Sequence, residues 1–341
     1  MMTIERVKIG FVFMLLVLSC VSSVNANNIR PKGVFDSDDV LKLTLIADFN
    51  KLNTERDKSA GYLEGKVIYN DKKEVELPVK VKVRGNYRLK ETTCEFAPLK
   101  LKFSKSDVGR TIFRNNRKVK LVTHCQENDE MLNSVIREYT AYRIYNSISE
   151  YSLRVRLVEI NYVDSNDGTS FQKYGFFIED KDDMCDRLGA KEYKVMNVRL
   201  DQIEEQEMVK MSMFQYMIGN EDWSVPMMHN VILVKDDNHS PYIAIPYDFD
   251  MSYFVNPPYR KEITGPVETA TIYKGDKVKF DELRKQVTHF TETKNEVLNM
   301  ILDLPQMSLE CKQRCLSEIE EFYAKLETKS SLRRNFMAHV K

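Results

Sequence analysis

The sequence predicts an α+β protein with a sheet-rich first half and a helical second half. Short segments in which apolar and basic residues alternate dominate up to about residue 185, and long amphipathic segments dominate after it. Runs of strands followed by runs of helices are typical of α+β folds. We therefore expect residues 27–185 to form a sheet-rich lobe and residues 186–341 to form a helical lobe.

Residues 1–26 have the pattern of a cleaved signal peptide. Arg6 and Lys8 precede an apolar run at 9–18, and small residues lead to Ala26. The run is shorter than the roughly 20 apolar residues of a membrane-spanning helix, and no later stretch predicts a span. We expect export to the periplasm, the outer surface or the medium. A membrane anchor is the weaker alternative, and a third is a lipoprotein anchor at Cys20.

The charge of the chain limits its partners. Lysine and arginine number 51, aspartate and glutamate also number 51, and the formal net charge at pH 7 is zero. This balance gives no support for a nucleic-acid partner. The chain has only 12 glycines, so a glycine-dense phosphate loop is not expected either.

Five cysteines follow the predicted signal peptide, and export permits them to pair. We predict a disulfide between Cys94 and Cys125, because each lies close to predicted strands. Cys311 and Cys315, one helical turn apart, are a poorer pair, and the odd count, with Cys185, leaves at least one thiol free or one pair unformed. Zinc is the alternative, but the sequence has no CxxC and no nearby pair of histidines.

Strands and helices are predicted from the period of the apolar residues. The expected strands are 79–84, 99–103, 118–122, 153–163 and 171–179. The first three place basic residues on one face, which is equally consistent with a solvated face and with a binding face. The expected helices are 129–148, with Asn128 or Asp129 as its cap, 200–218, 278–302 and 307–338.

Polar residues gather in the segment 219–250. Strands 231–236 and 242–247 are expected to form a hairpin with His239 at its midpoint. Counting from that midpoint places Asn230 opposite Asp248 at the open end.

Two more carboxylates are expected at the same end of the hairpin. The helix at 200–218 delivers Asp222, and Asp250 follows closely after Asp248. Asparagine and aspartate oxygens suit Mg²⁺, and a separate carboxylate suits a general base that takes a proton from a hydroxyl. Phosphoryl-transfer sites have this composition. The alternative is that these residues only cap turns and hairpin ends.

The order helix, Asp, Asn, hairpin, Asp-Phe resembles the catalytic segment of protein kinases, which implies a two-lobed kinase-like fold. More closely, the chain resembles the spore-coat CotH group of secreted atypical kinases. That group shows Asn-x-Asp, a later Asn, a Tyr-Asp-Phe-Asp-like end and an early Arg-Gly-Asn before a strand with lysines. The matching segments here are 220–222, Asn230, 247–250, 84–86 and 98–103.

The resemblance implies a role for each matching residue, with ATP and Mg²⁺ or Mn²⁺ as cofactors. Asp222 is the expected catalytic base. The expected metal ligands are Asn230 and Asp248, with Asp250 beside them. The expected nucleotide-binding residues are Lys102, with Lys100 as the lesser candidate, Glu138 to orient the lysine, and Arg84 and Asn86 in place of the glycine-rich loop.

The chain also departs from the kinase pattern. Asp222 and Asn230 are eight positions apart, and Asp250 stands where kinases have glycine. Two functions therefore remain open. One is a secreted kinase that phosphorylates protein hydroxyls, and the other is a non-catalytic kinase-like module that binds an envelope or adhesion partner.

Overall fold

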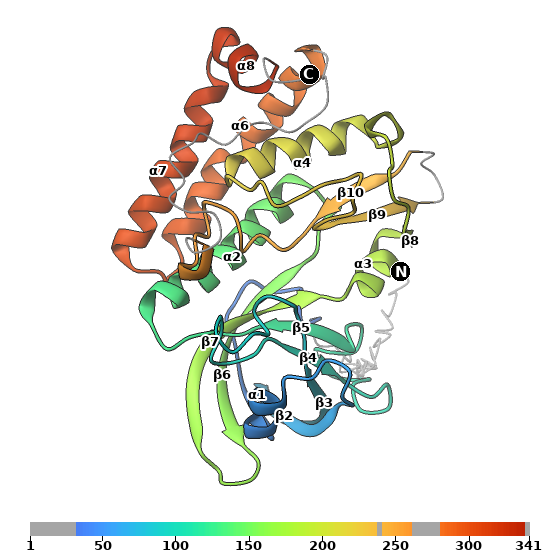
Figure 1. Cartoon of the computed structure of the whole chain (residues 1–341), viewed down its shortest axis with the longest axis vertical. Helices are drawn as coiled ribbons and strands as arrows, with labels where there is room; N and C mark the ends of the chain where they lie inside the picture. Colours follow the sequence, from blue (N-terminus) through green and yellow to red (C-terminus); the bar gives the residue numbers. More distant parts are fainter. Residues whose placement is uncertain (1–31, 237–240, 261–279, 338–341) are drawn as a thin grey trace, which may run out of the picture. The chain divides into compact units, whose positions relative to one another are not determined.

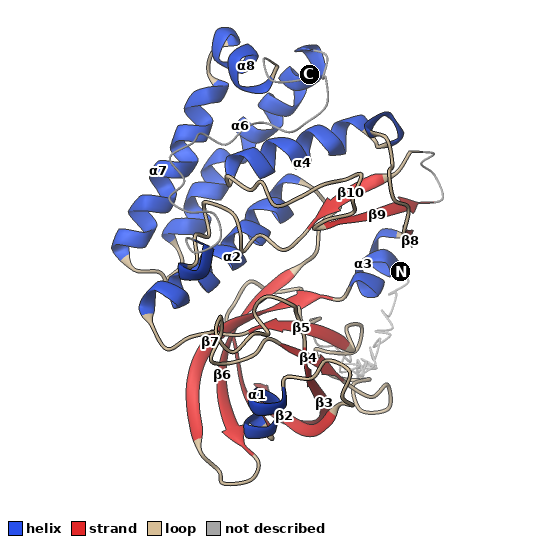
Figure 2. Ribbon diagram, viewed as in Figure 1, coloured by secondary structure: helices blue, strands red, loops and turns tan. Residues whose placement is uncertain are grey.

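A closed barrel of seven strands makes up most of the first half of the chain (Figures 1 and 2). The computed structural model describes residues 32–236, 241–260 and 280–337, which belong to one compact unit. The predicted signal peptide and Cys20 lie outside the described residues. The strands are β1 (Leu41–Ala47), β2 (Leu63–Asp71), β3 (Lys73–Val83), β4 (Leu99–Lys102), β5 (Lys118–Val122), β6 (Val155–Asp164) and β7 (Ser170–Glu179).

Alternation of apolar and basic residues decides which face of the barrel is buried. Strands β3, β4 and β5 are antiparallel neighbours, with Val81 opposite Leu101 and Leu101 opposite Val119. These three side chains are fully buried inside the barrel, while the lysines between them face outward. The prediction that 79–84 and 99–103 share a sheet is confirmed.

Closure of the sheet was not predicted. It depends on parallel pairing between β1 and β6, with Leu43 opposite Ile160, which joins segments more than a hundred residues apart. Gly175 in β7 permits a close approach to β5, because a Cβ at this position would lie 2.5 Å from the Val122 carbonyl oxygen. The short helix α1 (Phe49–Glu55) follows β1.

Helix α2 (Asp129–Ile148) has the predicted bounds. The Asn128 side chain accepts a hydrogen bond from the Met131 amide and caps it. The helix packs against β6 and β7 and also against α6 (Phe280–Leu302). Because it is enclosed on both sides, it buries Arg137 and Glu138 as well as its apolar residues.

The second half is mainly helical, as predicted, so the α+β architecture is confirmed. Its remaining elements are α3 (Lys181–Leu188), β8 (Ala190–Tyr193), η1 (Leu200–Gln202), α4 (Glu205–Met217), β9 (Val231–Asp236), β10 (Ile243–Pro246), α7 (Leu309–Leu326) and α8 (Lys329–Phe336). In the described residues, no helix is both long and apolar enough to cross a bilayer.

Two predicted helices were too long. The helix expected at 200–218 begins at Glu205, because the chain first makes the 3₁₀ turn η1 and Ile203 then bridges to Tyr242. The helix expected at 307–338 is two helices, since Thr328 caps a new one.

The hairpin register differs from the prediction by one residue. Val231 pairs with Pro246, and the Tyr247 amide donates to the Asn230 carbonyl at 3.0 Å. Asn230 therefore lies opposite Tyr247 and not opposite Asp248. The return strand β10 begins at Ile243, and Tyr242 forms an isolated parallel bridge with Ile203. The predicted midpoint, His239, lies outside the described residues.

Candidate active site

A cavity of about 600 Å³ is enclosed by the loop after β3, helix α2 and the loops around the β9–β10 hairpin. Every predicted site residue except the two lysines lines it. These residues are Arg84, Asn86, Glu138, Asp222, Asn230, Asp248 and Asp250. The structure thus brings together side chains from both halves of the chain.

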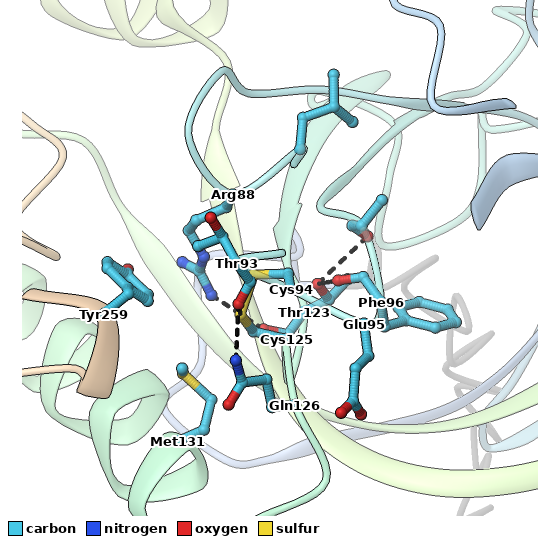
Figure 3. The surroundings of a disulfide bond; sticks show 12 residues. Arg88, Thr93, Cys94, Glu95, Phe96, Thr123, Cys125, Gln126, Met131 and Tyr259 are labelled. Atoms are coloured by element: carbon cyan, nitrogen blue, oxygen red, sulfur yellow. Dashed lines mark hydrogen bonds between the residues drawn. A yellow bond between two sulfur atoms is a disulfide. The ribbon is translucent and has the colours of Figure 1, made fainter. Parts of the chain in front are cut away.

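The loop that follows β3 forms the cationic wall of the cavity. Gly85 has φ of +91°, a conformation that favours glycine, and it separates Arg84 from Asn86. The loop is held in place by the predicted disulfide between Cys94 and Cys125, which is confirmed (Figure 3). Arg56 also binds the loop, since its guanidinium donates to the Cys94 carbonyl at 2.6 Å.

Arg88, which the sequence analysis missed, is the partner of Glu138. Its guanidinium lies 3.1 Å from the Glu138 carboxylate, and the two side chains are only 11% and 3% exposed. It also donates to the Thr123 carbonyl at 3.2 Å, beside the disulfide (Figure 3). Glu138 was expected to orient Lys102, so this part of the prediction is corrected: the helix-borne glutamate holds an arginine from the disulfide-bonded loop.

Asp222 lies at the mouth of the cavity, with its side chain 41% exposed. His229 Nε2 lies 2.7 Å from one carboxylate oxygen. The Asn230 amide nitrogen donates to the other at 3.0 Å and to the Asp222 carbonyl at 2.8 Å. Asp222 and Asn230 are therefore hydrogen-bonded directly to each other, although they lie eight positions apart in the sequence.

Asp248 and Asp250 differ in burial. Asp248 is exposed in the cavity, and its backbone amide donates to the Tyr142 hydroxyl of α2 at 2.8 Å. Asp250 is buried and accepts a hydrogen bond from the Tyr259 hydroxyl at 2.7 Å. Helix α2 therefore lines the cavity through Glu138 and holds the Asp248 backbone through Tyr142.

Left-handed backbone conformations concentrate at this site. Met228, Asn230 and Asp248 have φ of 49°, 53° and 63°. Asparagine and aspartate tolerate this region better than other non-glycine residues. Strained backbone persists where the surroundings enforce it, and it concentrates at functional sites.

The buried carboxylates are crowded. Burial raises the pKa of Asp250 to about 6, and the Asp248 charge adds to this effect against Arg88. Burial also raises the pKa of Glu138 to about 8, against the opposing attraction of Arg88. Burial alone would lower the pKa of Arg88, but Tyr259 and the carboxylates around it raise it above its ordinary value. Burial therefore disfavours the charged form of both carboxylates, and Arg88 offsets this effect only in part.

The predicted lysines lie away from this cavity. Lys100 bonds to Asp180 at 3.0 Å, and Lys102 lies over the Tyr62 ring on the outside of the barrel. A third lysine, Lys120 of β5, is closer to the site. Burial, the Arg84 charge and the Lys100 charge lower its pKa to about 8, while Asp248 opposes them. Its place in an alternating strand gave no signal that distinguished it from its neighbours.

A second hollow of about 370 Å³ adjoins the cavity and shares Met228 and Tyr247 with it. Lys120 lines this hollow, together with the apolar side chains of Val231 and Ile232. A lining that combines lysines with apolar side chains suits a ligand with an anionic end and a flat, uncharged end.

The donor set fits a hard divalent cation such as Mg²⁺. In the described part of the chain, no three His, Cys, Asp or Glu side chains lie close enough to hold a metal by themselves. Mg²⁺ commonly takes one or two carboxylates and completes its shell with phosphate oxygens and water. Asp248, Asp250 and the Asn230 amide match that requirement, and a bound cation would offset the cost of keeping the buried Asp250 carboxylate charged beside Asp248.

Comparisons with known proteins include solved kinase structures. No protein-family model and no curated protein matches the sequence. The structure is similar to the proinflammatory kinase CtkA of Helicobacter pylori, at 12% identity and a TM-score of 0.41, over 67% of this chain and 90% of that chain. It is also similar to a Golgi casein kinase with Mn/ADP bound, at 11% identity and a TM-score of 0.34. This match covers 75% of this chain and 74% of that chain. A further match is hydra Fam20 with sugar, at 9% identity and a TM-score of 0.29. This match covers 90% of this chain and 91% of that chain.

Proposed function

We propose that this chain is an exported kinase-like phosphotransferase of the CotH-like kind, which transfers phosphate from ATP to protein hydroxyls with Mg²⁺ or Mn²⁺. The observation that supports the proposal is the convergence of Asp222, Asn230, Asp248 and Asp250 with Glu138 and two arginines on one cavity. Positioning and charge neutralisation are the main demands of phosphoryl transfer.

Each residue supports one task. Asp222 is exposed at the mouth of the cavity, where a substrate hydroxyl can reach it and give up a proton. Asn230 fixes the Asp222 carboxylate through its amide nitrogen, so its amide oxygen is the atom left for a cation. Arg84, in the loop after β3, lies where it can bind nucleotide phosphates.

The metal would be held by Asp248, Asp250 and the Asn230 oxygen. When bound, it neutralises phosphate charge and aligns the transferred group. Arg88 keeps Glu138 and the disulfide-bonded loop in place beside it.

The decisive test is Asp248→Asn. The substitution removes one charge and keeps the shape and the left-handed backbone, which asparagine tolerates. We expect ATP with Mg²⁺ to raise the melting temperature of the wild type and not that of the variant. Transfer of labelled phosphate from ATP to a mixed protein substrate should be lost in the variant as well.

Asp201→Asn is the matched control, because Asp201 is an exposed aspartate that pairs with Arg199 and does not line the cavity. It should respond to ATP like the wild type. If neither the wild type nor the control responds, and Asp248→Asn merely melts earlier, Asp248 only holds a turn and the proposal is wrong.

A second candidate function is a non-catalytic kinase-like module that binds an envelope partner. The pairing of Glu138 with Arg88, in place of the expected lysine, supports this alternative. It predicts that no labelled phosphate is transferred with any metal, whether or not ATP and Mg²⁺ raise the melting temperature.

A further inference from the structure

Six lysines form a regular array on the outside of the barrel. Lys80, Lys102 and Lys118 lie directly opposite one another on β3, β4 and β5, and so do Lys82, Lys100 and Lys120. We call these six residues the lysine grid. Like charges directly opposite each other destabilise a sheet, so the grid is a costly arrangement for a merely solvated face.

The chain neutralises only part of the grid. Lys80 pairs with Glu64 at 3.2 Å, Lys100 with Asp180 at 3.0 Å and Lys118 with Asp182 at 3.0 Å. These three pairs also show that the grid accepts carboxylates in this geometry.

The remaining three lysines make other kinds of contact. Lys82 and Lys102 lie over the Tyr62 ring at 5.1 and 5.8 Å, and Lys120 lies over Tyr247 at 5.9 Å. Lys82 also donates to the Lys58 carbonyl at 3.1 Å. Among the described residues, none of the carboxylates forms an ion pair with these three ammonium groups, so the grid keeps a net positive charge.

Lys82, Lys100 and Lys120 form the inner row of the grid, which leads to the candidate active site, and Lys80, Lys102 and Lys118 form the outer row. Lys120 lines the hollow that adjoins the cavity, and its charge interacts with Arg84 and Asp248. A segment that lies on the grid can therefore continue into the site.

We propose that the lysine grid docks an acidic segment of the protein substrate. Lysines two residues apart on one strand are separated by about 6.6 Å, which matches alternate side chains of an extended peptide. Glutamates at alternate positions can thus face successive rows. This inference rests on the proposed function, because it names the substrate class that the same site would take.

Peptide binding tests the proposal without nucleotide. The probe is a fluorescein-labelled peptide in which Glu alternates with Ser, and its partner has Gln in place of every Glu. We expect fluorescence anisotropy to show binding of the Glu peptide only, and affinity should fall as salt rises.

A matched pair of double variants locates the binding surface. Lys80→Gln with Lys118→Gln removes two exposed charges from the outer row and should weaken binding roughly fivefold, the scale of two exposed charge pairs. Lys42→Gln with Lys66→Gln removes two charges elsewhere on the barrel, where they pair with Glu159 and Glu76, and should leave the affinity unchanged.

Three results would overturn the proposal. The first is that the Gln peptide binds as tightly as the Glu peptide. The second is that both double variants lose the same amount of affinity for the Glu peptide. The third is a labelled single-stranded oligonucleotide that binds the grid more tightly than the Glu peptide. The ATP-induced melting shift, measured on the same proteins, separates this failure from failure of the phosphotransferase proposal, because peptide binding needs no nucleotide.

Discussion

Asp250 is the buried carboxylate of the candidate metal site. Its pKa is raised to about 6 by burial and by Asp248, against Arg88 and the Tyr259 hydroxyl. A raised pKa means that the folded state binds the proton more tightly than the unfolded chain. Stability therefore falls as pH rises between about 4 and about 6, and the full cost persists above that window.

We predict that Asp250→Asn stabilises the metal-free protein. The amide still accepts from Tyr259 but carries no charge, so the free energy of unfolding at pH 8 should rise by about 1–3 kcal/mol. Urea denaturation at pH 4 and pH 8 measures this, and the gain should be small at pH 4. An equal gain at both pH values would contradict the electrostatic explanation.

Lys120 is the grid lysine that lines the hollow beside the cavity, and we expect it to bind nucleotide phosphate together with Arg84. Its pKa is lowered to about 8 by burial and by Arg84, so an incoming anion would relieve an unfavourable position. Lys120→Gln should weaken ATP binding about tenfold, a size typical of a hydrogen bond to a charged group. Isothermal titration with a nonhydrolysable ATP analogue and Mg²⁺ measures the effect.

Lys102→Gln is the matched control for that experiment. Lys102 lies two residues from Lys100 on β4, outside the cavity and beside Tyr62. If Lys102→Gln weakens nucleotide binding more than Lys120→Gln does, the assignment from the sequence is the correct one.

At the scale of elements, the disulfide-bonded loop after β3 decides the shape of the site. Cys94 and Cys125 are 31 residues apart in sequence, and the bond joins this loop to the segment just before α2. The loop carries Arg84 and Arg88, while α2 carries Glu138. The bond therefore holds the loop that carries the two arginines close to the start of the helix that carries Glu138.

We predict that Cys94→Ser with Cys125→Ser lowers the free energy of unfolding by about 2–4 kcal/mol. It should also weaken ATP binding, because the arginines lose their fixed position. Denaturation and titration of one sample measure both effects. Cys185→Ser, at a buried free thiol, is the control and should leave ATP binding unchanged.

At the scale of the whole described unit, α2 couples the barrel to the helical half. It packs against β6 and β7 on one side and α6 on the other. Ile144, fully buried in this helix, belongs to the core cluster that includes residues of β7 and α6. Truncation of the Ile144 side chain should therefore destabilise both halves.

We predict that Ile144→Ala lowers the stability of both halves together by about 2–5 kcal/mol. Trp223 is the single tryptophan and is buried in the helical half, so its fluorescence reports that half. Far-ultraviolet circular dichroism reports the entire chain. The two transitions should shift by the same denaturant concentration, and a fluorescence transition that stays in place would show that the halves unfold separately.

The sequence by itself determined the local structure of this protein. Period-two alternation predicted β3, β4 and β5, and Asn128 with its acidic first turn predicted the start of α2. The same local signals placed Asp222 and Asn230 near the open end of a hairpin. These predictions succeeded because burial on one face imposes a period on the residues of a single strand or helix.

Only the tertiary structure decided which distant residues meet. The parallel contact of β1 with β6 closes the barrel, and Arg88 rather than a strand lysine reaches Glu138. Neither has a local signal, since an arginine in a loop looks like any solvated cation until another segment buries it. The position of Asn230 opposite Tyr247 likewise follows from the pairing of Val231 with Pro246, which the count from the predicted midpoint missed by one residue. Local periodicity specifies faces, whereas partners across the fold follow from packing of the whole chain.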